Sequence, residues 1–153
     1  ARLLTRELDR NVSSPRFTAD GRAIEFLLED SGARHLARVG VSGGRVERPI
    51  AGDRAVGAWH SAAGVTVAAV SEPHRPDELF ALERGRPRKL TATNDSLLAA
   101  LRLADVRNIH FRSTDGTEVE GWLFHPVGYR EGRRYPTLLR IHGGPVSQYD
   151  WGF

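Results

Sequence analysis

The sequence predicts two blades of a β-propeller followed by the first strands of an α/β domain. Three observations lead to this prediction. Short extended runs separated by glycine-containing turns fill the first hundred residues, several positions recur 43 residues later, and an apolar run ends directly in His142-Gly143-Gly144-Pro145. Units of about 40 to 45 residues with four short strands each are typical of propeller blades.

Short strands are expected throughout residues 1–95, because no window with helical periodicity is long enough to compete with them. Most of these runs follow a turn that contains glycine, as at Asp20-Gly21 and Gly64. Strands this short usually form meanders. The expected strands are Ala23–Leu28, His35–Val41, Val46–Ile50, Val65–Val70, Glu78–Leu82 and Arg88–Leu90.

A self-comparison supports the repeat. Five positions, Gly21, Ile24, Phe26, Leu36 and Val39, have counterparts 43 residues later at Gly64, Val67, Ala69, Leu79 and Leu82. Residues 1–95 are therefore assigned to the last two blades of a propeller. A generic antiparallel sandwich with coincidental spacing is the alternative. Two blades leave unpaired strand edges, so this interpretation requires further blades from the remainder of the polypeptide.

The pattern changes after Asn94. Residues 96–105 read as an interdomain connector, and its apolar stretch Ser96–Ala104 has room for one or two helical turns. The second domain is assigned to residues 106–153. It opens with the runs Val106–Arg112 and Glu118–His125 around Asp115-Gly116, and Asp-Gly between two extended runs is a strong hairpin signal.

Composition excludes several classes of protein. The 153 residues are 40% hydrophobic and 27% charged, and no apolar run approaches the roughly 18 residues of a membrane span. Cysteine is absent, so a disulfide framework or Cys-based zinc site is excluded. The sequence pI is about 9.9, but the cations are spread among 19 acidic residues, which argues against a nucleic-acid partner.

Neither a signal peptide nor a cofactor motif is recognisable, so a cytoplasmic protein without cofactor, metal or membrane partner is expected. Histidine spacing also gives no support for a metal site, since no pair has the i, i+4 spacing of a helical zinc site. The histidines outside the glycine motif are His35, His60, His74, His110 and His125.

The run Thr137–Ile141 has the character of a strand covered on both faces, and it leads into His142-Gly143-Gly144-Pro145. Glycine lets the backbone turn sharply and lets a ligand atom approach its N–H groups. In α/β-hydrolases the loop after the third strand supplies such an N–H to the oxyanion hole. A simple tight turn is the alternative interpretation, because Gly and Pro are common turn residues.

The order of repeats, connector, hairpin, Tyr135-Pro136, apolar strand and HGGP resembles the prolyl oligopeptidase family (S9) of serine peptidases, and HGGP resembles its acylaminoacyl-peptidase-like branch. The resemblance covers nearly the whole chain, with its most specific segments at Arg112–Pro126 and Tyr135–Pro145. It implies an α/β-hydrolase domain capped by a propeller, of which this chain is an internal, incomplete fragment.

The resemblance also implies roles for single residues. Gly144 matches the oxyanion N–H donor, and Gly143 matches the neighbour that gives the loop its shape. His142 stands where sister branches have a tyrosine and is expected to orient the loop, with a structural histidine as the alternative. Tyr149, Trp151 and Phe153 are expected to pack beside the loop, and Tyr149 and Trp151 are also candidates for substrate contact.

The triad is missing from this sequence. No G-x-S-x-G elbow is present, and in this family the Ser, Asp and His lie well C-terminal to HGGP. The resemblance thus implies part of a serine exopeptidase that cleaves short peptides through an acyl-enzyme, inactive without the remainder of its polypeptide. Alternatives are a non-catalytic propeller binding module and a carboxylesterase with an HGGG-like loop. The cleavage position, the side-chain preference and homo-oligomerisation stay open.

Overall fold

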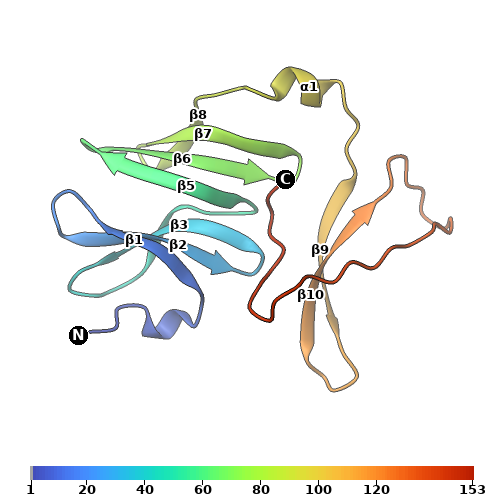
Figure 1. Cartoon of the computed structure of the whole chain (residues 1–153), viewed down its shortest axis with the longest axis horizontal. Coiled ribbons are helices and arrows are strands. Elements are labelled where there is room, and N and C mark those ends of the chain that lie inside the picture. Colours follow the sequence, from blue (N-terminus) through green and yellow to red (C-terminus); the bar gives the residue numbers. More distant parts are fainter. Residues whose placement is uncertain (1) are drawn as a thin grey trace. The chain divides into compact units, whose positions relative to one another are not determined.

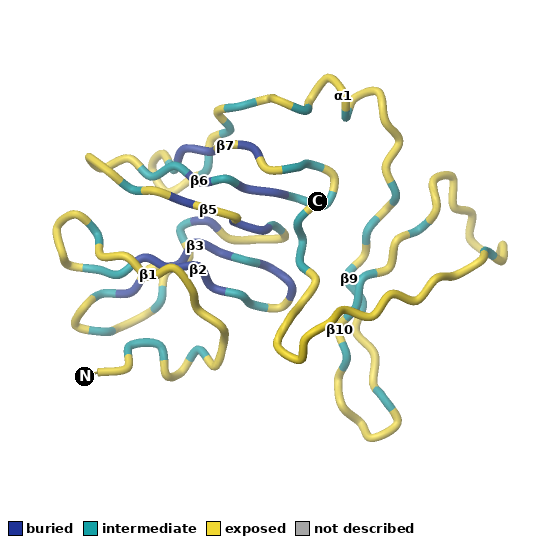
Figure 2. The backbone as a smooth tube through the Cα atoms, in the orientation of Figure 1, coloured by how far each residue is buried: buried dark blue, intermediate teal, exposed yellow. Residues whose placement is uncertain are grey.

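The computed structural model describes residues 2–153, which form two compact units. The first unit runs through Ser96 and also contains Asp150–Phe153, and the second spans Leu97–Tyr149. Buried residues concentrate in the strands of the first unit, whereas the second unit is exposed or half-buried throughout (Figure 2). None of the helices in the described part of the chain is long and apolar enough to span a membrane.

The first unit consists of two four-stranded antiparallel meanders, here called blade 1 and blade 2 (Figure 1). A single 3-10 turn, η1 (Arg6–Leu8), precedes them. Blade 1 comprises β1 (Val12–Phe17), β2 (Ala23–Asp30), β3 (Ala33–Gly40) and β4 (Glu47–Ile50). Blade 2 comprises β5 (Ala55–Ala62), β6 (Val65–Glu72), β7 (Arg75–Glu83) and β8 (Arg86–Lys89).

The two blades are joined almost entirely by the packing of their side chains. Within the described residues, the two blades share one ladder pair, Arg34 with Ala55 in parallel register. The main core cluster draws on both of them, with Leu27, Leu36 and Ile50 from blade 1 and Val56, Trp59, Ala68, Val70 and Phe80 from blade 2. Burial of this apolar surface, at roughly 25 cal/mol per Å², is what holds the blades together.

The other face of blade 1 carries a second cluster. Phe26, Leu28, Ala37 and Val39 are buried there, and Leu4 and Leu8 from the N-terminal segment pack against them. Successive residues of a strand point to opposite faces, so β2 and β3 bury apolar side chains on both faces. This burial on both sides accounts for the three consecutive apolar residues Phe26–Leu28 in β2.

The 43-residue spacing holds in one part of the repeat and is one residue out of register in another. Phe26 pairs with Ala37 across β2 and β3, and the equivalent pair in blade 2 is Ala68 with Phe80. Positions in β3 and β7 are therefore 43 apart, whereas those in β2 and β6 are 42 apart. The predicted match of Phe26 with Ala69 fails for this reason.

Two strands, β1 and β5, have no counterpart among the predicted ones. β1 is exposed at every position and contains Pro15 next to a register shift between Ser13 and Arg16. Proline is tolerated at such irregularities on an edge strand. β5 has a register shift between Val56 and Ala58. Both strands lack the simple alternation from which a strand is predicted.

The segment between β8 (Arg86–Lys89) and the short helix that follows it is attached to blade 2 by a buried carboxylate. Glu78 lies in β7, accepts a hydrogen bond from the Thr91 hydroxyl, and accepts another from the Asn94 N–H at 3.1 Å. These bonds to the charged form, led by that of Thr91, hold the pKa of Glu78 below its usual value. The chain then enters the short helix α1 (Asp95–Ala99), as the connector prediction allowed.

In the second unit β9 (Asp105–Arg112) and β10 (Glu118–His125) form the predicted hairpin. The turn is closed by Asp115, which accepts hydrogen bonds from the Ser113 hydroxyl and from the Thr117 N–H at 2.9 Å. Asp20 makes the same arrangement with Thr18 between β1 and β2. A hydroxyl residue two positions before Asp-Gly therefore builds both turns.

This turn gives a prediction about acid pH. Bonds from Ser113, and then from Thr117, lower the pKa of Asp115 from 3.8 to about 2. A carboxyl group with a lowered folded-state pKa stabilises the fold above its unfolded value, and that contribution is lost as pH falls from about 4 towards 2. Carbon-13 NMR titration of the carboxyl group should give a midpoint near 2. A midpoint near 3.8 would contradict the turn geometry, and Asp115→Asn should remove only the part of the pH dependence of stability that comes from this turn.

The predicted strand Thr137–Ile141 is not a strand in this structure. Leu138 is 97% exposed and Ile141 is 80% exposed. A central strand exists only through the ladder bonds and apolar faces of its neighbours, and no described segment pairs with these residues. The prediction of a strand covered on both faces is therefore wrong for this structure.

Candidate glycine-loop site

The glycine loop, residues 142–145, lies on an extended and exposed stretch of the second unit. No described residue pairs with the backbone N–H of Gly143 or Gly144. The next backbone hydrogen bond along the chain runs from the Ser147 N–H to the Pro145 carbonyl at 3.2 Å, between residues two positions apart. Two consecutive amides are thus free to bind an acceptor from another molecule or another part of the polypeptide.

The two glycines have different surroundings. A Cβ atom on Gly143 would meet nothing within 4 Å, whereas one on Gly144 would lie 3.1 Å from the Val146 nitrogen. Neither residue has a positive φ. Glycine is needed at position 144 because the backbone at Val146 comes too close for a side chain. The open space around Gly143 leaves its N–H group accessible.

His142 is bonded to the loop that it begins. Its Nδ1 lies 2.8 Å from the Gly143 carbonyl oxygen. Because a carbonyl can only accept, this geometry requires the proton on Nδ1. The ring also meets Tyr149 edge-on, with centroids 5.7 Å apart. The predicted orienting role of His142 is compatible with these contacts.

Tyr149 and Trp151 were both predicted to contact substrate, and only Tyr149 belongs to the same unit as the glycine loop. The guanidinium of Arg140 stands 5.3 Å from its ring centroid, a cation–π distance. Trp151 belongs to the first unit instead, where its backbone N–H donates to the Gly32 carbonyl at 2.8 Å. The structure thus groups His142 with Tyr149.

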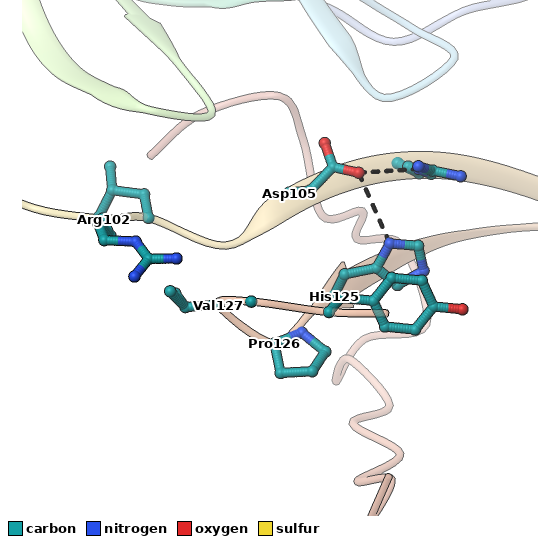
Figure 3. Close-up of a pocket in the computed structure, with 9 residues that line it drawn as sticks. Arg102, Asp105, His125, Pro126 and Val127 are labelled. Atoms are coloured by element: carbon teal, nitrogen blue, oxygen red, sulfur yellow. Dashed lines mark hydrogen bonds and ion pairs between the residues drawn. The ribbon is translucent and has the colours of Figure 1, made fainter. Parts of the chain in front are cut away.

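A separate cavity of about 350 Å³ lies at the base of the β9–β10 hairpin. There His125 Nδ1 lies 3.6 Å from the Asp105 carboxylate, and Arg107 donates to the same carboxylate at 2.9 Å (Figure 3). The bond from Arg107 is the main cause of the lowered pKa of Asp105. The lining residues, which include no serine, threonine or cysteine, are Arg102, Leu103, Asp105, Arg107, His125, Pro126, Val127, Gly128 and Tyr129.

The Asp105–His125 pair therefore has no nucleophile beside it, although an acid and a histidine are two parts of a catalytic triad. His125 is also stacked on Tyr129, with centroids 4.0 Å apart and planes 7° apart. Sequence reasoning did not single out this cluster, because its members are 20 residues apart and only the hairpin register, which pairs His125 with Asp105, brings them together. Nor do the described residues contain a cluster of three or more metal-binding side chains.

Comparison with known proteins places the chain among peptidases, although no profile of a known family matches it. It is 36% identical over 84 residues to the uncharacterized peptidase YuxL of Bacillus subtilis strain 168, which covers 54% of this chain and 13% of that protein. It is 25% identical over 150 residues to dipeptidyl-peptidase 5 of Porphyromonas gingivalis, covering 95% of this chain and 22% of the relative.

A solved acylaminoacyl peptidase, in complex with Z-Gly-Gly-Phe-chloromethyl ketone, superposes on 98% of the chain with a TM-score of 0.85 and 25% identity. The chain belongs to the S9 family of serine peptidases. The family resemblance found in the sequence is thereby confirmed, and the matched members include acylaminoacyl peptidase and dipeptidyl-peptidase 5.

This S9 segment spans only about a fifth of its relatives, 23% of that acylaminoacyl peptidase and 22% of the P. gingivalis enzyme. Its all-β part matches the propeller region of these peptidases. The β-propeller domain of the Trilobed protease from Pyrococcus furiosus also matches 63% of the chain, with a TM-score of 0.53 and 25% identity. The prediction of a β-propeller segment is therefore confirmed, and the sandwich alternative is discarded.

Proposed function

We propose that the chain is part of an acylaminoacyl-peptidase-like serine hydrolase that cleaves short peptides. Residues 1–95 are its last two propeller blades, residues 96–105 connect the domains, and residues 106–153 begin an α/β-hydrolase domain. A cytoplasmic location and the absence of a cofactor belong to the same proposal. The extent of the similarity to acylaminoacyl peptidase, which continues through the second unit, supports the assignment of residues 106–153.

The observation that carries the proposal is the pair of unbonded amides at Gly143 and Gly144 on a loop fixed by His142. When a serine attacks a peptide carbonyl, the oxygen gains negative charge, and preorganised N–H donors stabilise that charge. The Gly144 N–H is the donor in this proposal. Gly143 leaves room for the substrate, and His142 holds the loop through the Gly143 carbonyl.

The rest of the reaction uses residues outside this sequence. The serine hydroxyl adds to the carbonyl while histidine takes its proton, and the amine then leaves with that proton to give an acyl-enzyme. Water repeats the sequence and releases the acid. The blades restrict access to short peptides, and Tyr149 and Trp151 are the candidates for substrate contact in this chain.

A fluorophosphonate probe tests the proposal, because it labels an activated serine covalently. The complete polypeptide is expected to be labelled at one serine, which lies in a G-x-S-x-G segment within about 100 to 150 residues after Phe153. Replacing that serine with alanine serves as the control. Absence of both the segment and the label would favour a non-catalytic propeller module. Labelling with hydrolysis of esters but not of peptides would favour a carboxylesterase.

A further inference from the structure

Asp150–Phe153, the four residues that follow the second unit, bind to the blades. Asp150, Trp151 and Gly152 are half-buried, after a run of exposed residues. The Trp151 N–H donates to the Gly32 carbonyl in the β2–β3 turn at 2.8 Å, and the Phe153 N–H donates to the Ser71 hydroxyl oxygen in β6 at 2.8 Å. The segment thus engages backbone and side-chain acceptors on both blades.

An ion pair and a close contact complete this attachment. Arg34 Nη2 lies 3.8 Å from Asp150 Oδ2, while the other oxygen of Asp150 accepts the Gly152 N–H at 2.8 Å. A Cβ atom on Gly152 would lie only 3.5 Å from Ala55 Cβ and 2.8 Å from Asp150 Oδ1. Glycine at this position therefore lets the segment fold onto its own aspartate and lie against the start of β5.

Arg34 is central to this arrangement, because it also joins the two blades. Its Nε donates to the Val56 carbonyl in β5 at 2.8 Å, and its own N–H donates to the Arg54 carbonyl at 3.1 Å. Asp150 is thus paired with the residue that makes the one ladder contact between the blades. The attachment site is the blade junction itself.

We propose that Asp150–Phe153 is a docking segment through which the propeller positions the glycine loop. Only five residues separate Gly144 from Asp150, so fixing Asp150 on the blades limits the conformations open to the loop. Arg34, Ser71 and Asp150 are then positioning residues for the oxyanion amides. This inference rests on the proposed function, because it assigns a regulator to the same site.

The test uses the complete polypeptide with Ser71→Ala and Asp150→Asn combined. Asparagine keeps an oxygen for the Gly152 N–H but removes the charge that faces Arg34, and alanine removes the acceptor of the Phe153 N–H. We expect kcat per fluorophosphonate-labelled site to fall about 5-fold, as the loss of roughly 1 kcal/mol of positioning implies. KM should change less, because the loop acts on the transition state.

Two controls separate positioning from general damage. Ser71→Thr keeps the hydroxyl and should retain kcat. Glu47→Gln removes the exposed ion pair with Arg38, 2.7 Å long and within blade 1, and should leave kcat unchanged. Should the double variant be insoluble, Ser71→Ala alone is compared with Ser71→Thr in the same assay.

Hydrogen exchange gives a readout that does not depend on activity. Amides 143–149 should exchange faster in the double variant than in the parent, while those of β2 and β3 should not change. Unchanged exchange and unchanged kcat per labelled site would overturn the docking inference and leave the proposed function intact. A parent polypeptide without any labelling would instead refute the function, and the exchange result would still decide whether the segment holds the loop.

Discussion

Replacing Gly144 with proline in the complete polypeptide is expected to lower kcat by about 10²- to 10³-fold, the usual cost of losing one oxyanion donor. Proline removes the N–H that we assign to the developing oxyanion. The change leaves every triad residue in place, so substrate binding should be affected less than turnover. Steady-state kinetics with a short peptide substrate, normalised to fluorophosphonate-reactive sites, measures the effect.

Gly144→Ala is the matched control for this experiment. It adds the same Cβ, 3.1 Å from the Val146 nitrogen, but keeps the N–H. The difference between the two variants therefore isolates the donor from the crowding. Equal kcat values for the proline and alanine variants would contradict the assignment of Gly144.

Replacing Leu36 with alanine is expected to destabilise the propeller region by about 2 to 5 kcal/mol. Leu36 is 0% exposed and lies in the cluster shared by both blades. The substitution removes its transfer free energy and leaves a cavity at the junction. Urea denaturation of the complete polypeptide, followed by tryptophan fluorescence, should show a lower transition midpoint.

Val41→Ala provides the comparison, since Val41 directly follows β3 and is 43% exposed. An exposed apolar side chain contributes little, and surface substitutions usually change stability by less than about 0.5 kcal/mol. A loss at Leu36 no larger than that at Val41 would show that the junction is not the core of this region.

The sequence-based prediction succeeded where local chemistry decides structure. Turns form at both predicted Asp-Gly pairs, Asp20-Gly21 and Asp115-Gly116, and the alternating run after Asp115 forms the predicted hairpin. The role of the glycine motif stays a prediction. The first strand of each blade, β1 and β5, was not predicted. A proline in β1 and an irregular register in β5 hide the alternation from which a strand is recognised.

Other features depend on tertiary context and could not be predicted from local pattern. Leu36 and Leu79 occupy equivalent places in the repeat, yet Leu36 is buried and Leu79 is 44% exposed. The reason is that Phe80 faces blade 1, so its neighbour Leu79 points to the opposite face of the strand. The hydrogen bonds of Trp151 to Gly32 and of Phe153 to Ser71 join residues more than 80 positions apart, so no window of sequence could predict them.

The single ladder pair between the blades has a mechanical consequence. Apolar contact is non-directional, whereas a continuous ladder fixes its two strands in one register. A small displacement of one blade relative to its neighbour therefore breaks no row of backbone hydrogen bonds. In a ring built from such blades, shear is expected to occur between blades, while the sheet within each blade keeps its structure.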